Sequence, residues 1–331
     1  MLLGAGWLAA QSQPAAELLN PDQTFADMFA AVLLGENPDG GAWGSAGKYI
    51  EAASERSSPQ PLAIQRILQP GINQYHLLIV PGFLSACATS RLVSAPVFKQ
   101  AQQHLKVRHS VDVAVLQVPD DSSENNGMLI ARYLLQHAND GKKYIVIGHS
   151  KGAVDLQLAL QDPAVASVVV ALVSIAGAVR GSPVADLAAG PDLVGSVAGC
   201  VGKLGPSLQS LRSDERRAFL ANHPNPSVPS YSLVASSSLF DTSQALLATW
   251  GLLGAGVPPE DGLLVAADGT LPGAKFLGTA LADHVAVAHD FQKSKFLLFF
   301  NQSHFPRTAL LEAIVRFVIA DLDARSKPGD R

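Results

Sequence analysis

From residue 75 onward, short and almost continuous apolar runs alternate with longer stretches of helical periodicity. The runs predicted to be strands are Tyr75 to Val80, Val111 to Val118, Tyr144 to Ile147, Val168 to Ile175 and Tyr231 to Ala235. Such runs fit strands that are buried on both faces, as in a parallel sheet. Helices are predicted over Ser122 to His137, Lys151 to Leu160 and Arg307 to Leu322. The alternation implies right-handed crossovers and an α/β fold, with a mostly parallel central sheet flanked by helices.

No repeat or flexible linker divides the 331 residues, and a hydrophobic content of 48% is enough for one large core. We therefore predict a single domain over residues 1–331. Its parts are an N-terminal helical extension (about 1–60), a core (about 61–181 and 229–331) and an apolar helical cap insertion (about 182–228). In the extension, apolar residues at helical spacing predict a helix over Asp22 to Leu34 that packs on the core.

Charge is sparse and balanced. The chain has 24 Lys+Arg and 28 Asp+Glu, a net charge of -4 without basic blocks, so no nucleic-acid partner is expected. No apolar run reaches the ~18 residues that span a bilayer. The apolar start, Met1 to Ala10, lacks a basic segment, which argues against a secretory signal and favours a cytoplasmic location. Cys87 and Cys200 fit no zinc-type spacing, and two free thiols are preferred to one disulfide. These features leave the oligomeric state open.

A nucleophile motif follows the third predicted strand. Gly148-His149-Ser150-Lys151-Gly152 lies between the run Tyr144 to Ile147 and a predicted helix, which is the strand, turn, helix context of a GxSxG elbow. The small glycines allow the strand and the helix to approach, while the sharp turn exposes the Ser150 hydroxyl. The alternative is a serine that only caps the helix.

A serine hydroxyl needs a base to take its proton, and the base needs a carboxylate to orient it. In the chain order serine, acid, histidine, His284 comes after a short apolar segment from Lys275 to Gly278 that is the predicted last strand. His284 is therefore the predicted base, with His289 and His304 as alternatives. His223 precedes the strand that should lead to the acid, and we interpret it as a surface residue.

The acid is expected between the run Tyr231 to Ala235 and His284. Five carboxylates stand there: Asp241, Glu260, Asp261, Asp268 and Asp283. Asp261 is favoured because two prolines stiffen the chain before it and Gly262 permits a tight turn after it. Asp241 is the next choice. Asp283 is adjacent to His284 and is expected to point elsewhere.

Two backbone N–H groups are needed to bind the oxyanion of a tetrahedral intermediate. One is predicted to be that of Lys151, which follows the nucleophile. The other is predicted to be that of Phe83, in the loop Pro81-Gly82-Phe83-Leu84 after the first predicted strand. Three residues beside these groups are predicted to contact the substrate: Gly82, Leu84 and His149.

Four segments of the chain resemble the α/β-hydrolase superfamily, in particular its bacterial lipase-like members. They are Val80-Pro81-Gly82-Phe83, the elbow at 148–152, the stretch from Ile175 to Asp186, and Asp261-Gly262-Leu263 with Asp283-His284. The resemblance covers about residues 75–323 and implies Ser150, Asp261 and His284 as the catalytic triad. Those lipases have His-Gly where this chain has Pro81-Gly82. No carboxylate set matches their calcium site, so neither a metal nor another cofactor is expected.

These observations predict a serine carboxylic-ester hydrolase, an esterase or lipase, that cleaves esters of apolar acyl groups through an acyl-enzyme. Its partner would be a small-molecule ester or lipid substrate, with no integral membrane segment. The same triad also serves acyltransferases, thioesterases and polyester depolymerases. A non-catalytic binding protein of the same fold is the alternative outside enzymes.

Overall fold

The fold is built on one central sheet. The computed structural model describes residues 25–41, 43–51, 72–82, 97–188, 205–223, 227–243, 246–289 and 305–326. Seven strands form the sheet in the order β1-β7-β6-β5-β4-β2-β3. They are β1 (Ile50–Glu51), β2 (His76–Val80), β3 (Val113–Val115), β4 (Tyr144–His149), β5 (Val169–Ile175), β6 (Ser230–Ser236) and β7 (Lys275–Leu281). β1 pairs antiparallel with β7 and the other neighbouring pairs are parallel, so the predicted mostly parallel sheet is confirmed.

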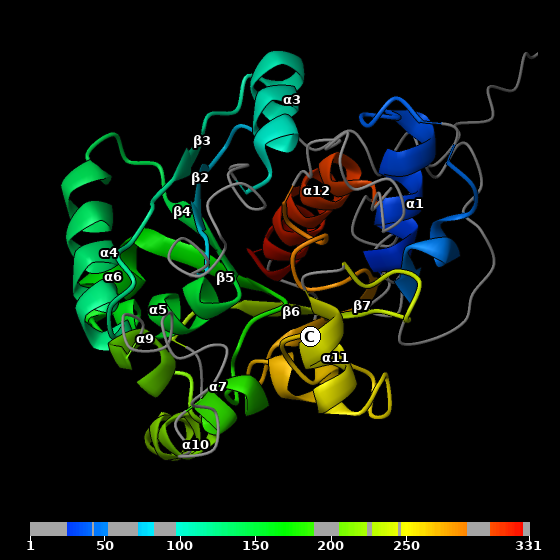
Figure 1. The fold of residues 1–331 in the computed structure, drawn as a ribbon. Coiled ribbons are helices and arrows are strands. Elements are labelled where there is room, and N and C mark those ends of the chain that lie inside the picture. Colours follow the sequence, from blue (N-terminus) through cyan, green and yellow to red (C-terminus); the bar gives the residue numbers. More distant parts are fainter. Residues whose placement is uncertain are drawn as a thin grey trace, which may run out of the picture.

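Helices cover both faces of the sheet (Figure 1). The longer ones are α1 (Phe25–Gly35), α3 (Lys99–His109), α4 (Ser123–His137), α5 (Lys151–Ala159), α10 (Ser213–Asn222) and α12 (Arg307–Ser326). The shorter ones are η2 (Ala46–Lys48), α6 (Pro163–Val168), α7 (Pro183–Ala188), α9 (Gly205–Gln209), α11 (Leu247–Leu253) and η4 (Ala266–Gly269). In Figure 1, α4, α5 and α6 lie on one side of the sheet and α1 and α12 lie on the other. The sheet is therefore the middle of three layers.

The strands at the centre of the sheet form where the sequence has β-branched residues on both faces. In β4, Ile145, Val146 and Ile147 are all fully buried, because helices cover both sides of the strand. β3 is shorter than the predicted run Val111 to Val118. It is the edge strand and pairs with β2 alone among the described strands, and just beyond it Leu116 N still donates to Ile79 O at 2.9 Å.

β1 was not predicted from the sequence. Its two residues join the sheet edge beside β7, where Ile50 pairs with Ala280 and Glu51 with Thr279. Gly278 makes this contact possible, since its φ is +123° and a Cβ there would lie 2.7 Å from Glu51 O. Part of the predicted N-terminal extension thus belongs to the sheet.

The predicted N-terminal helix is confirmed as α1. It packs against α12 and β7, and Phe25 meets Phe317 edge to face with ring centroids 5.9 Å apart. Both helices belong to the larger of two main apolar clusters, which lies on their side of the sheet, and the other main cluster lies under α4, α5 and α6. Nearly every α12 side chain from Thr308 to Ala320 is buried, so this helix closes the fold.

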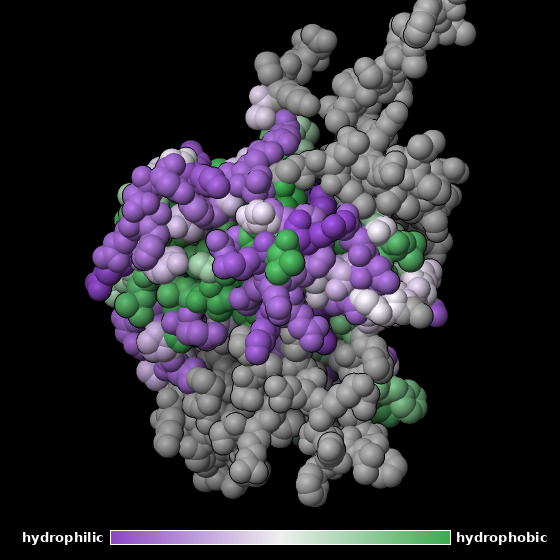
Figure 2. Space-filling view, turned by 90° about the horizontal axis from the view of Figure 1, so that it is seen from above, coloured by the Kyte–Doolittle hydropathy of each residue, from purple (hydrophilic) through white to green (hydrophobic). Residues whose placement is uncertain are grey.

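Much of the predicted cap insertion is not described. α7, α9 and α10 come from this region, whereas residues 189–204 lie outside the described ranges, and the proposed division into extension, core and cap stays a prediction. Cys87 and Cys200 also lie outside these ranges. Within them, no helix is long and apolar enough to cross a membrane. Seen from above, the described surface is mainly hydrophilic (Figure 2).

Candidate active site

Ser150 stands at a sharp turn between β4 and α5. Its backbone has φ 57° and ψ −127°. Residues other than glycine rarely adopt this conformation, which is typical of strained turns at functional sites. The flanking glycines explain how the turn fits. A Cβ on Gly152 would lie 2.0 Å from Val80 O, and one on Gly148 would lie 2.4 Å from Ala153 N. The elbow predicted from the sequence therefore has the backbone that its glycines imply.

Ser150, His284 and Asp261 form one hydrogen-bonded chain. The Ser150 hydroxyl lies 2.8 Å from His284 Nε2, and His284 Nδ1 lies 2.8 Å from Asp261 Oδ2. Asp261 and His284 are buried, and 7% of Ser150 is exposed. An imidazole in this position takes the serine proton on Nε2 while Nδ1–H stays bonded to the carboxylate. The structure thus brings together the three residues that the sequence predicted as a triad.

The second oxygen of Asp261 is held by the backbone. Asp261 Oδ1 accepts from the N–H groups of Leu263, at 3.0 Å, and Leu264, at 2.8 Å. Ser182 in turn donates its hydroxyl to Leu263 O at 2.9 Å. The Gly-Ser segment before α7 thus holds the loop at residues 260–264, which we call the acid loop. His284 N also donates to Asp261 O at 2.8 Å. The carboxylate is therefore fixed against the imidazole from several directions.

The other candidate acids lie elsewhere. Asp283 accepts from Ser243 N at 2.6 Å and from the Ser243 hydroxyl, so it points away from His284 as expected. These bonds connect the loop that carries His284 to the loop after β6. Burial raises the pKa of Asp283, although these donors oppose the shift. Asp241 is exposed and accepts from the Ser238 hydroxyl at 2.5 Å.

Glu260 precedes Asp261 and is also buried. Burial, together with the nearby charge of Asp261, raises the pKa of Glu260 to about 7. Gly262 N donates to its Oε2, while Oε1 has no hydrogen-bond partner among the described residues. Two acidic groups thus stand side by side in sequence, and one of them titrates near neutral pH.

His149 lies behind the site, which differs from its predicted role in substrate binding. It is 0% exposed, and its Nε2 donates to the backbone carbonyl of His284 at 2.9 Å. Burial, and then the neighbouring His284 and His289, lower the pKa of His149 well below its ordinary value. Its ring centroid is 5.0 Å from that of His284 and 5.5 Å from that of His289. His149 therefore stays neutral and contacts the base rather than the substrate.

The loop at residues 283–289, which we call the base loop, has further anchors. Phe98 N donates to Ala288 O at 2.8 Å, and Arg307 Nη1 donates to Ala286 O at 2.8 Å. Val97 forms an isolated antiparallel bridge with His289. Sequence reasoning missed these anchors, because they act on main-chain atoms and carry no sequence pattern. Of the alternative bases, His289 is at the end of this loop and packs on His149, and His304 lies outside the described residues.

The predicted oxyanion side is described in part. Lys151 is the first residue of α5, where backbone N–H groups have no carbonyl partner within the helix. Its side chain is buried and pairs with Asp155 at 2.7 Å. Gly82 reaches the nucleophile so closely that a Cβ would lie 2.4 Å from Ser150 Cβ and 2.8 Å from Oγ. The predicted residues Phe83 and Leu84 lie outside the described ranges.

A cavity of about 860 Å³ opens beside the base loop, at the carboxyl ends of β6 and β7. Its walls include Leu239, Phe240 and Trp250, and Ala282 brings it within two residues of His284. Trp250 is itself mostly buried and donates its ring N–H to Ser237 O at 3.1 Å. The cavity therefore combines an apolar part of its wall with polar side chains that include Lys48 and Asp241.

No protein-family model and no curated protein matches this chain. Among solved structures, the metagenomic carboxyl esterase MGS0156 matches with a TM-score of 0.72 and 30% sequence identity, covering 90% of this chain and 91% of that chain. The chain belongs to the α/β-hydrolase superfamily. The resemblance predicted from the sequence is thereby confirmed.

This α/β-hydrolase also shares its fold with a lipase. The mature form of Bacillus licheniformis lipase BlEst2 matches with a TM-score of 0.50 and 21% identity, covering 71% of this chain and 91% of that chain. The strand order, the elbow after β4 and the histidine after β7 fit the superfamily pattern. The structures that this α/β-hydrolase resembles thus include an esterase and a lipase.

Proposed function

We propose that this protein is a serine carboxylic-ester hydrolase that cleaves esters of apolar acyl groups. One observation carries the proposal: Ser150 Oγ, both imidazole nitrogens of His284 and Asp261 Oδ2 form an unbroken chain with two contacts of 2.8 Å at the elbow. The similarity to a carboxyl esterase over nine-tenths of the chain supports ester substrates in particular. Leu239, Phe240 and Trp250, in the wall of the cavity that Ala282 also lines, support an apolar acyl group.

The reaction follows from the roles of these groups. His284 Nε2 takes the Ser150 proton as Oγ bonds to the ester carbonyl carbon, and the carbonyl oxygen becomes an oxyanion held by the N–H groups of Lys151 and Phe83. Asp261 stabilises the imidazolium, which then protonates the leaving alcohol as the ester C–O bond breaks. Water next gives a proton to His284 as its oxygen attacks the acyl-enzyme carbonyl carbon. His284 then returns that proton to Ser150 Oγ as the bond between Oγ and the acyl carbon breaks, which releases the acid and free Ser150.

The experiment is hydrolysis of p-nitrophenyl esters from acetyl to dodecanoyl by the wild type and by Ser150→Ala. Ser167→Ala is the matched control, because Ser167 is exposed on α6 and bonds only to Ala164 O within its helix among the described residues. We expect hydrolysis by the wild type and the control, and a loss of at least ~10³ in kcat for Ser150→Ala.

A fluorophosphonate probe checks the nucleophile independently of substrate choice. It should label the wild type once, at Ser150, and leave Ser150→Ala unlabelled. Hydrolysis that survives in Ser150→Ala would contradict the assignment of the nucleophile. Labelling at Ser150 without turnover of any ester would instead favour transfer of the acyl group to an acceptor other than water.

A further inference from the structure

Two histidines and a glutamate converge where α3 packs on α12, outside the active site. His104 Nε2 lies 2.7 Å from Glu312 Oε2, and His109 Nε2 lies 3.1 Å from Glu312 Oε1. All three side chains bring a possible ligand atom within 4.8 Å of one another. Glu312 is 208 residues from His104 in the sequence, so only the packing of the two helices creates this cluster.

His109 is poorly satisfied by hydrogen bonding alone. Its Nε2 is buried and has no hydrogen-bond partner among the described residues, because its direction toward Glu312 Oε1 does not suit an N–H···O bond. The rings of His104 and His109 stand 5.5 Å apart at an interplanar angle of 72°, with both Nε2 atoms directed at the same carboxylate. A buried polar atom without a partner costs free energy, and a metal ion would accept its lone pair.

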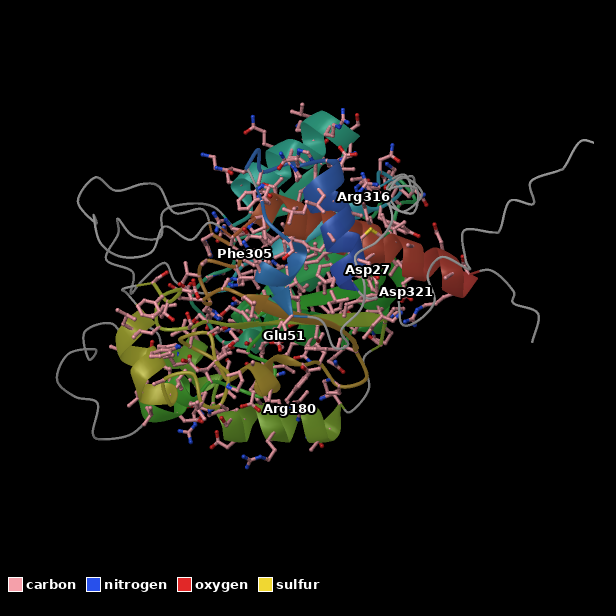
Figure 3. The ribbon with its side chains drawn as sticks, turned by 90° about the vertical axis from the view of Figure 1, so that its right-hand side faces the viewer. Asp27, Glu51, Arg180, Phe305, Arg316 and Asp321 are labelled. Atoms are coloured by element: carbon pink, nitrogen blue, oxygen red, sulfur yellow. The ribbon has the colours of Figure 1, made fainter. Side chains whose placement is uncertain are left out.

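Glu312 does not need the histidines to balance its charge. Arg316 Nε donates to Glu312 Oε1 at 2.8 Å, from the next turn of α12. Figure 3 shows Arg316 on the part of α12 that lies below α3. Glu312 thus presents Oε2 to His104 and Oε1 to His109, and one carboxylate between two imidazoles can serve as a ligand set.

We propose that His104, His109 and Glu312 bind one divalent transition-metal ion, of which zinc is the best match. Two imidazole nitrogens and one carboxylate oxygen, with water in the fourth position, form a known tetrahedral zinc set. At zinc distances of about 2.0 Å, ligand atoms stand roughly 3.3 Å apart. The observed separations, 2.7 Å from His104 Nε2 to Oε2 and 3.1 Å from His109 Nε2 to Oε1, are each within about 0.6 Å of that value. Because they involve different oxygens, a small rotation of the carboxylate or of His109 is needed to bring one oxygen to face both imidazoles. This assignment departs from the sequence-based expectation of no metal.

Arg316 has two opposing effects on such a site. By bonding Glu312 Oε1 it fixes the orientation of the carboxylate, as partners of metal ligands commonly do. Its positive charge also repels the ion, so the site binds zinc more weakly than a closed site of four protein ligands. The imidazoles are 18% and 14% exposed, which leaves a path for the ion from solvent.

Zinc at this position would clamp α3 to α12. Both helices reach the base loop, through Phe98 just before α3 and through Arg307 at the start of α12. A bound ion would therefore stabilise the frame that holds the catalytic histidine without touching the substrate. Bound zinc is therefore expected to raise the stability of the protein. It should change turnover only if the packing of α3 and α12 on the base loop loosens without the ion.

The test uses the full chain after treatment with a chelator, titrated with Zn²⁺ alone. We expect one Zn²⁺ per chain by calorimetry and, at a hundredfold excess over Kd, a rise in Tm of about 4 °C. Co²⁺ should give the visible absorption of a tetrahedral site. His104→Ala and His109→Ala should each lose the Tm shift and the Co²⁺ spectrum. His137→Ala, a helical histidine on the surface of α4, should keep both.

The proposal is overturned if the wild type binds no Zn²⁺, or if both ligand variants bind it as the wild type does. Folding of the variants is checked by circular dichroism and by ester hydrolysis in the absence of metal, since none of the three residues belongs to the triad. A variant that hydrolyses ester but no longer binds Zn²⁺ supports the site independently of how the proposed function stands.

Discussion

Replacing His149 tests whether the residue before the nucleophile positions the base. Its single described bond, from Nε2 to the carbonyl of His284 at 2.9 Å, lies in a fully buried place. In His149→Leu the backbone carbonyl of His284 loses this hydrogen-bond donor, which costs about 1–3 kcal/mol of stability. His284 is then free to shift, and a shift approaching 1 Å lowers the rate about a hundredfold. We expect kcat to fall about tenfold to a hundredfold, with KM little changed.

Two further variants separate positioning from general damage. In His149→Gln the amide nitrogen stands about as far from Cβ as His149 Nε2 does, so it restores the donor and should recover most of kcat. Ile130→Val, in α4, costs about 0.5–1.5 kcal/mol in the other apolar cluster, away from the triad. It should lower Tm with normal kcat.

The assay is steady-state hydrolysis of p-nitrophenyl butyrate between pH 6 and 9, together with Tm. Because burial keeps His149 neutral, its loss should lower kcat without adding a new ionisation to the pH profile. A His149→Leu enzyme with the full kcat of the wild type would refute the positioning role. Equal losses in His149→Leu and His149→Gln would also refute it, since the hydrogen bond would then not be the cause.

Two other residues of the acid loop give separate predictions. Asp261→Asn should lower kcat by about 10⁴ with Tm retained, because the amide favours the wrong imidazole tautomer, whereas Asp268→Asn, outside the triad, should hydrolyse ester normally. Glu260→Gln should raise stability in urea by about 3 kcal/mol at pH 8 and change it little at pH 4.5. The sign follows from the raised pKa of Glu260: its folded form holds a proton that the unfolded form has lost, so stability is lost as pH rises from about 4.5 to about 7. Equal effects of Glu260→Gln at both pH values would show that the carboxyl group does not titrate as described.

The elbow and the main strands were predictable because each depends on local sequence. β4 forms from β-branched residues that suit two buried faces, and Ser150 follows it with glycines where the backbone needs them. His284 and Asp261 could be chosen because the superfamily fixes the order of the three residues along the chain. Their contacts of 2.8 Å then depend on how the two loops pack.

Features that depend on distant packing were not predictable. His149 was interpreted as a substrate contact because it neighbours Ser150, but its ring points toward a carbonyl 135 residues away. β1 has only two residues and no periodicity, so its sequence does not indicate a strand. His104 and Glu312 carry no ligand spacing along the chain, since they meet across two helices.

The two apolar clusters place different demands on the order in which the chain folds. The cluster under α4, α5 and α6 draws mainly on residues 78–179, which leave the ribosome as neighbours and can pack early. The cluster on the other face joins α1 to α12, and α12 begins at Arg307. During synthesis, α1 therefore exposes its apolar face until the chain has been made as far as α12. Loss of α12 by premature termination would leave that face open to aggregation or to chaperones, even though Ser150, Asp261 and His284 were all present.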